Sequence, residues 1–304
     1  MSHVLSSFAV TVDMANPGQV IACCGVFELA NRKWPGAEGW FDGRQFRVAI
    51  PGRYDDNALG CLVKTLAESE ISGLSEEEYD ERVRLEKEGK ELRRKGLKLP
   101  EDKEKRRQEL GEQARAGVIR IGAPFDLLLD WWQTDDEVAP KTWAGRQELH
   151  KIARAAQDAL SGISDLTTLL DYGCVLRKPK EYWTSDSDGK EKVEPFYFDA
   201  RRFAHALDTG FSLDTQEMET IANPAVELLC LIGLQRFRPA TAPAKWGFDY
   251  WIWSQPLSAP VAAAVFSGVS PLPGSQGYRF RLRFRDDQKR GKAFGLTARI
   301  GGDW

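Results

Sequence analysis

Apolar and basic residues alternate with a period of two along residues 278–285. The apolar set is Tyr278, Phe280, Leu282 and Phe284, and the basic set is Arg279, Arg281, Arg283 and Arg285. Because successive side chains of a β-strand point to opposite faces, this pattern predicts a strand whose apolar set packs on a core. The four guanidinium groups would then form a row on the other face, with a spacing of about 7 Å. This row is either a contact for an anionic partner such as a nucleic-acid backbone or a solvated face balanced by acidic neighbours.

The rest of the hydrophobic pattern predicts a mixture of strands and helices. Short apolar runs predict strands at residues 8–12, 46–50, 125–132, 248–253 and 261–266. Longer apolar or amphipathic runs predict helices at residues 20–33, 58–68, 142–160 and 166–176, with a turn at 16–19 and a loop at 178–194. Asn223 and Pro224 suit a helix N-cap and first turn, and they open another strongly apolar helix.

Residues 75–116 differ sharply in composition from the segments on either side. Between Glu76 and Glu109 there are twelve acidic and twelve basic residues, with very few large apolar side chains. This favours an exposed helical hairpin, broken near Gly96–Pro100 and supported by i,i+4 ion pairs, with a disordered segment as the alternative. A solvated insertion is the simpler interpretation, and a partner surface is the functional one.

These elements together predict an α+β fold. It would have mixed sheets with packed helices and an exposed charged helical insertion near residues 75–116. The expected organisation is an N-terminal α/β part at residues 1–74, the insertion at 75–116, and the α+β remainder of the same core at 117–304. A chain of 304 residues with 42% hydrophobic residues is long enough to bury a sizeable core.

Composition limits the class of protein. The net charge of −3 argues against a uniformly basic binder, but it is compatible with a local basic surface. The five cysteines, at positions 23, 24, 61, 174 and 230, form no CxxC pair and fit a reducing compartment. The N-terminus lacks a secretory signal, and no segment approaches the ~20 apolar residues of a membrane span. We therefore expect a soluble cytoplasmic protein with no membrane partner.

Known catalytic motifs are absent from the sequence. The phosphate-binding GxxxxGK[ST] loop, the GxSxG elbow, the GxGxxG fingerprint and the HExxH motif do not occur. We therefore predict a protein that is not an enzyme, with no cofactor and no metal site. One alternative is a magnesium-dependent nuclease that uses Asp199, Asp208 and Asp214, although a helix cap, an ion pair and a turn explain these residues more simply.

Signals for nucleic-acid binding are richer. Residues 276–304 carry eight Lys or Arg residues and three Asp residues, and guanidinium groups pair bidentately with phosphate. Most of the ten tryptophans are expected in the core, namely Trp131, Trp132, Trp143, Trp246, Trp251 and Trp253, with one or two tryptophans as candidates to stack on bases. The candidate nucleic-acid-binding residues are Asn16, Gln19, Arg32, Lys33, Arg44, Arg47, Arg53, Arg279, Arg281, Arg283, Arg285, Lys289 and Arg290. We expect Asn16, Gln19, Arg44 and Arg53 near base edges and the 279–285 arginines on phosphates.

Three segments, in the same order along the chain, resemble one known family. The first is Asn-Pro-Gly-Gln-Val-Ile-Ala-Cys-Cys-Gly-Val-Phe-Glu-Leu-Ala at 16–30, followed by Trp-Pro-Gly-Ala-Glu-Gly-Trp-Phe at 34–41. The second is Pro-Phe-Tyr-Phe-Asp-Ala-Arg-Arg at 195–202, and the third begins Asn-Pro-Ala-Val-Glu-Leu-Leu-Cys-Leu-Ile-Gly-Leu at 223–234. The combination resembles the compact large-subunit-like proteins of the Csb group, which belong to type I-U or I-G CRISPR systems.

The resemblance implies a non-catalytic subunit of the RNA-guided surveillance complex Cascade, which acts in antiviral defence. Such subunits contact the 5′ handle of the guide RNA and recognise the protospacer-adjacent motif in target double-stranded DNA. The implied partners are the CRISPR guide RNA, the target DNA, other Cascade subunits and a recruited helicase-nuclease. No motif-reading residue is carried over from the family, so the candidate residues above rest on residue type alone.

Other functions stay open at this point. A backbone or guide-processing subunit of the same complex would have a ferredoxin-like fold and a glycine-rich loop, for which residues 273–277 are a weak match. A scaffold with no nucleic-acid partner is a further alternative. Salt-sensitive binding of DNA or RNA would argue against the scaffold, and magnesium-dependent cleavage would indicate the nuclease.

Overall fold

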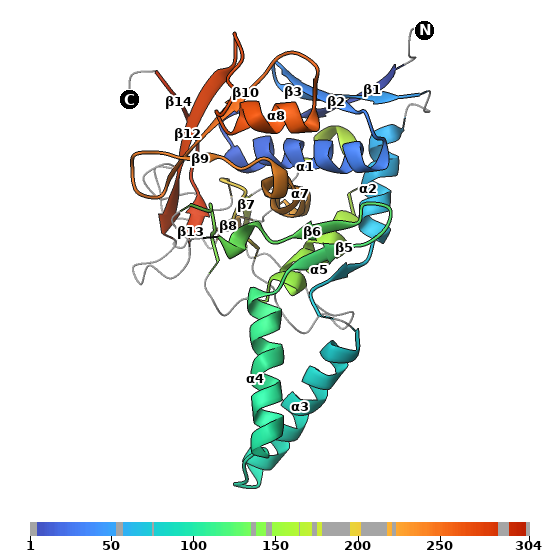
Figure 1. The fold of residues 1–304 in the computed structure, drawn as a ribbon, viewed down its shortest axis with the longest axis vertical. Helices are drawn as coiled ribbons and strands as arrows, with labels where there is room; N and C mark the ends of the chain where they lie inside the picture. Colours follow the sequence, from blue (N-terminus) through green and yellow to red (C-terminus); the bar gives the residue numbers. More distant parts are fainter. Residues whose placement is uncertain are drawn as a thin grey trace.

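Two helices that are apolar on every side form the centre of the fold. They are α1 (Pro17–Lys33) and α7 (Pro224–Arg236), which pack against each other. The first fourteen residues of α1 and the first eleven of α7 are buried without a break. A helix with no polar face must be covered on all sides, and in Figure 1 α1 runs between α8 and α7.

Both central helices begin at an Asn–Pro pair whose asparagine is a buried N-cap. Asn16 Oδ1 accepts a hydrogen bond from the Gly18 N–H at 3.1 Å, and Asn223 Oδ1 accepts one from the Ala225 N–H at 2.8 Å. Proline suits the following position because the first helical N–H groups have no partner within the helix. The cap of α7 is confirmed, whereas the turn predicted at residues 16–19 is wrong because α1 already begins there.

Glycine lets the backbones of α1 and α7 touch where they cross. A Cβ atom on Gly25 would lie 2.0 Å from the Leu229 carbonyl oxygen, and one on Gly233 would lie 2.2 Å from the Ile21 carbonyl oxygen. Neither oxygen belongs to a flexible side chain that could move aside. The closeness of the two helices therefore depends on both glycines.

The computed structural model describes residues 5–52, 57–74, 76–134, 138–143, 148–163, 165–171, 175–177, 195–201, 218–220, 223–284 and 292–301. In addition to α1 and α7, the helices are α2 (Ala58–Glu68), α3 (Glu76–Arg94), α4 (Glu101–Ala116), α5 (Leu149–Leu160) and α8 (Ala259–Phe266), with 3₁₀ turns η1 (Trp131–Gln133) and η2 (Leu166–Thr168). The strands are β1 (Leu5–Thr11), β2 (Glu38–Asp42), β3 (Gln45–Pro51), β4 (Ile71–Ser72), β5 (Ile119–Ile121), β6 (Leu127–Leu129), β7 (Val175–Arg177), β8 (Met218–Thr220), β9 (Ala240–Thr241), β10 (Gly247–Ile252), β11 (Leu257–Ser258), β12 (Gln276–Phe284), β13 (Lys292–Phe294) and β14 (Ala298–Arg299).

The strands form several small sheets. One has the order β1–β3–β2–β11, and another has the order β13–β12–β10–β9 with β14 also paired to β12. Shorter sheets join β4–β5–β6 and β7–β8. The predicted α+β class is confirmed, and every described strand pair is antiparallel where mixed sheets were expected. Buried residues from both ends of the chain belong to one hydrophobic cluster.

The predicted charged hairpin is confirmed. Helices α3 and α4 project from the body as a two-helix arm (Figure 1). The connection turns at Gly96, whose φ of 74° lies in the left-handed region that favours glycine. Within the described ranges, no helix is both long enough and apolar enough to cross a bilayer.

Two predicted elements have the wrong type. Residues 261–266 were expected to form a strand, but they lie in α8, which begins with a proline at its first turn and is rich in alanine, the best helix former. Residues 166–176 were expected to form a helix, but they contain η2 and the start of β7. Strand β7 pairs with β8, more than forty residues further along the chain, and local periodicity gives no sign of that partner.

Two other predicted elements are shorter than expected. The strand predicted at residues 125–132 is reduced to β6, because Asp126 has a φ of 45° and the tryptophan pair forms η1. The helix predicted at 142–160 begins only at Leu149. The loop predicted at 178–194 lies outside the described residues.

Candidate nucleic-acid interface

Strand β12 has the two-sided character that its sequence predicts. Phe280 and Leu282 are buried, whereas Arg281 and Arg283 are exposed. The Phe280 ring packs on Phe248 of β10 and on Phe294 of β13, at centroid distances of 5.5 and 4.8 Å. These aromatic contacts hold the apolar face of β12 on the core and so direct its arginines outward.

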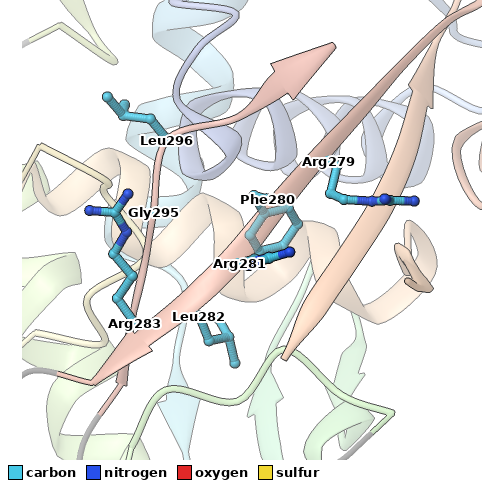
Figure 2. A pocket seen from close by; sticks show the side chains of 7 residues that line it. All are labelled: Arg279, Phe280, Arg281, Leu282, Arg283, Gly295 and Leu296. Carbon is cyan, nitrogen blue, oxygen red and sulfur yellow. The ribbon is translucent and has the colours of Figure 1, made fainter. Parts of the chain in front are cut away.

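A groove of about 410 Å³ lies against β12, and Figure 2 shows the side chains that line it. It is lined by Arg279, Phe280, Arg281, Leu282, Arg283, Gly295 and Leu296. Gly295 donates its N–H to the Arg281 carbonyl oxygen at 2.9 Å. A Cβ atom at Gly295 would lie 3.1 Å from Arg283 Nε, so the missing side chain leaves room for the guanidinium group beside it.

Arg279 is neutralised by the protein itself. Asp249 of β10 lies directly opposite Arg279 in the antiparallel register. Its carboxylate accepts from Arg279 Nε at 2.6 Å and from Arg279 Nη2 at 2.7 Å, and this bonding raises the pKa of the guanidinium. Arg279 is therefore already paired within the chain, and its contact with phosphate stays a prediction.

Of the other basic residues predicted on and after β12, two are exposed on the strand and three lie outside the described residues. Arg281 is exposed and has no ion-pair partner among the described residues. Arg283 is exposed at the far end of the groove. Arg285, Lys289 and Arg290, which were also predicted to bind, lie outside the described residues.

Two lysines and an aromatic ring extend the basic surface beyond the groove. Lys292 Nζ lies 3.4 Å from the centroid of the Trp246 ring, and Lys245 Nζ lies 5.3 Å from it. The carbonyl oxygen of Trp246 accepts a hydrogen bond from the Leu282 N–H at 2.9 Å, which places this cluster beside β12. Lysine ammonium groups are attracted to the face of tryptophan, so the ring helps to hold two cations at the end of the strand.

Little in the sequence indicated this Trp246 cluster. Its two lysines are separated by more than forty residues, and Trp246 was expected in the core. Of the other tryptophans expected there, Trp131, Trp132, Trp143 and Trp253 are buried, whereas Trp251 is also partly exposed.

Asn16 and Gln19, expected near base edges, are inside the protein. Asn16 Nδ2 donates to Asp199 Oδ1 at 2.7 Å, and Gln19 Nε2 donates to the Leu170 carbonyl oxygen at 2.7 Å. Both residues have at most 1% of their surface exposed. In this structure they stabilise the start of α1 and present no atoms to a base.

The basic residues at the end of α1 are also engaged within the chain. Arg32 donates to Glu28 Oε1 at 2.7 Å and to the Phe125 carbonyl oxygen at 2.9 Å. Lys33 donates to Thr65 Oγ1 at 3.1 Å. These contacts tie α1 to neighbouring segments and do not join Arg32 or Lys33 to the β12 groove.

The candidates of the β2–β3 hairpin belong to a different sheet from β12. Arg44 is exposed in the turn between the two strands. Arg47 donates to Asp42 Oδ2 at 2.8 Å across the same hairpin. Arg53 lies outside the described residues.

The carboxylates of the nuclease alternative are described only at Asp199. Asp199 is buried, and its oxygens accept from Asn16 Nδ2 and from Arg201 Nε and Nη2 at 2.7, 3.0 and 2.8 Å. Asp208 and Asp214 lie outside the described residues. Across the described part of the chain, no group of three or more His, Cys, Asp or Glu side chains is placed to hold a metal ion.

Comparisons with protein-family models, with curated proteins and with solved structures find no match to this chain. The similarity of residues 16–41, 195–202 and 223–234 to the Csb group therefore stays a prediction from the sequence.

Proposed function

We propose that this chain is a non-catalytic nucleic-acid-binding subunit of a type I CRISPR RNA-guided surveillance complex, acting in the cytoplasm. Its β12 groove contacts the phosphate backbone of the guide RNA handle or of target DNA, and the chain helps to recognise the protospacer-adjacent motif. The observation that supports nucleic-acid contact is the pair of exposed guanidinium groups, Arg281 and Arg283, on one face of one strand. The Csb-group segments support membership of the complex.

The groove suits a polyanion on electrostatic grounds. Arg281 and Arg283 are two residues apart on β12, so their side chains leave the strand about 7 Å from each other. Lys245 and Lys292 add positive charge at the same end of the strand, around Trp246. Positive side chains at this spacing suit the successive phosphates of a nucleic-acid strand.

Removing the two exposed arginines is expected to weaken nucleic-acid binding. The double variant Arg281→Gln/Arg283→Gln should raise the Kd for a random-sequence duplex by roughly tenfold and lower the salt slope by about two units. The measurement is fluorescence anisotropy over a series of salt concentrations.

A matched control removes one lysine and one arginine that are exposed elsewhere. Lys64 on α2 and Arg120 on β5 are both exposed, and neither lines the groove. The variant Lys64→Gln/Arg120→Gln changes the net charge by the same amount. An equal loss of affinity in the two variants would show that binding follows net charge, and the groove would then have no specific part in it.

Asp249 is expected to weaken nucleic-acid binding because its carboxylate is already paired with the Arg279 guanidinium. The variant Asp249→Asn keeps the shape of the side chain and removes its negative charge. We expect about threefold tighter binding and a salt slope steeper by about one unit, since one more guanidinium becomes available to phosphate. The double variant Asp249→Asn/Arg279→Gln should return to the wild-type affinity. Unchanged or weaker binding by Asp249→Asn would contradict this role.

Membership of the complex has its own test. A tagged chain expressed with its neighbouring proteins and a repeat–spacer array should bring down repeat-derived RNA together with several protein subunits. If the chain is recovered without RNA under conditions in which the purified chain still binds nucleic acid, that result would refute membership of the complex. It would leave the proposed binding by the groove intact.

The strand order gives partial support to the backbone-subunit alternative. The segment β1–α1–β2–β3, with sheet order β1–β3–β2, matches the first half of a β-α-β-β-α-β unit. The match then ends, because β4 pairs with β5 and β11 joins the sheet beside β2. Cleavage of repeat RNA by the purified chain would favour a guide-processing role over the one proposed.

A further inference from the structure

The charges of the α3–α4 arm are arranged differently along its stem and at its tip. On the stem, acidic and basic side chains pair between the two helices. Glu88 bonds Lys103 at 2.6 Å, and Glu81 bonds Arg106 at 3.0 Å. These pairs hold α3 against α4, and the stem as a whole is acidic, with twelve acidic and eight basic residues over 76–91 and 101–109.

Cations outnumber acids at the tip, where the exposed acids Glu91, Glu101 and Asp102 flank a segment with four Lys and Arg residues. Residues 92–100 contain Arg93, Arg94, Lys95 and Lys98 and no acidic residue. All four are exposed, and none forms an ion pair within the described part of the chain. Arg93 and Arg94 lie in the last turn of α3, where cations favour the helix dipole, but Lys95 and Lys98 lie beyond the last helical residue. Stabilising the end of α3 therefore does not account for the whole cluster.

The arm is anchored at its base and extended along its length. Leu110 and Ala114 of α4 are buried, and Arg82 of α3 forms an ion pair with Glu148, at the start of α5. Nineteen residues of α-helix span about 28 Å, so the tip is held well away from the body (Figure 1). A fixed arm of this length holds its cations where they can reach a partner that the body does not touch.

We infer that the arm tip, residues 92–100, is a second nucleic-acid contact that binds the phosphate backbone at a distance from the β12 groove. Four exposed Lys and Arg residues within six positions suit the continuous negative charge of a nucleic-acid strand. Leu97 is an exposed leucine at the tip, but charged residues crowd around it, and the centres of protein interfaces are usually depleted of charge. The inference rests on the proposed nucleic-acid binding and adds a separate contact to it.

The chain offers a matched pair of variants for the test. The tip variant is Arg94→Gln/Lys95→Gln/Lys98→Gln, which leaves Arg93 in place because Arg93 Nε donates to the Gly89 carbonyl oxygen. The stem variant is Arg84→Gln/Lys87→Gln/Lys105→Gln, and all three of its side chains are exposed. Each variant removes one arginine and two lysines from the same arm. Glutamine has nearly the helix propensity of lysine and arginine, so both arms should keep their helicity, which circular dichroism checks.

The assay uses the full chain and a labelled random-sequence duplex of about four helical turns, long enough to reach from the body to the tip. We expect the tip variant to raise the Kd about tenfold and to lower the salt slope by two to three units, while the stem variant changes the Kd less than twofold. Equal effects of the two variants, or no effect of the tip variant, would overturn the inference.

Combining the tip variant with Arg281→Gln/Arg283→Gln separates the two proposals. If only the groove substitutions weaken nucleic-acid binding, the tip contact is refuted. If only the tip substitutions weaken binding, the groove contact is refuted. A tip variant that keeps its nucleic-acid affinity but no longer copurifies with protein subunits would assign the tip to a protein partner and would also overturn the inference.

Discussion

Replacing Gly25 by alanine is expected to lower the free energy of unfolding by about 3 kcal/mol, because it forces apart the two helices at the centre of the fold. The added Cβ would lie 2.0 Å from the Leu229 carbonyl oxygen, far inside contact distance. That oxygen belongs to the backbone of α7, whose residues around it are fully buried, so the strain cannot be relieved by turning a side chain. A domain is stable by only about 5–15 kcal/mol, so the loss should be plain in urea unfolding followed by circular dichroism.

The same substitution at Gly89 serves as the control. Gly89 lies within α3, and a Cβ placed there would meet no heavy atom within 4 Å. Alanine favours the helix over glycine by about 1 kcal/mol, so Gly89→Ala should stabilise the arm. If Gly25→Ala unfolded at the wild-type urea concentration, the close backbone contact between α1 and α7 would not exist in solution.

The hydrophobic pattern predicted correctly several helices and strands that are buried on one face or on all sides. The alternation at residues 278–285 correctly placed the buried and exposed sides of β12, because a strand with one face on the core leaves that pattern in its sequence. Residues 58–68 predicted α2 with its observed bounds. At residues 261–266 the pattern misled, since a short apolar run is compatible with both strand and helix.

The electrostatic state of the groove could not be predicted from the local sequence. Arg279, Arg281 and Arg283 are equivalent in the pattern, but the antiparallel register sets Asp249 opposite Arg279 alone among them. Register depends on how β10 and β12 pair across an intervening helix, and no local signal fixes it. For the same reason, nothing in the local sequence indicated that Gly295 would border Arg283.

Burial decided the roles of the polar candidates near α1. An asparagine that caps a helix and one that reads a base use the same amide, so residue type does not separate the two roles. The Asn–Pro pair at residues 223–224 was correctly interpreted as a cap. Applied to Asn16 and Pro17, the same reasoning would have identified the second cap and would have argued against Asn16 as a base-reading residue.

His150 is expected to make the protein less stable as the pH falls from about 6.5 to about 4. This histidine lies in α5 with only 3% of its surface exposed, and burial lowers its pKa to about 4. Glu148 opposes the shift, whereas Arg154, Lys151 and Arg82 add to it. An unfolded chain titrates near the ordinary histidine value of about 6.5, so between these two values the unfolded state binds more protons than the folded state.

The sign and size of the effect follow from that difference. Since protons favour the state that binds more of them, acidification favours unfolding, and the loss should reach about 2 kcal/mol at pH 5 relative to neutral pH. The variant His150→Phe keeps a planar ring at the site and removes the titrating group. Its unfolding free energy, measured by urea titration at each pH, should fall about 2 kcal/mol less over this range than that of the wild type. Because the other two histidines are present in both proteins, the difference between the two curves isolates His150, and identical curves would show that His150 keeps its ordinary pKa in the folded chain.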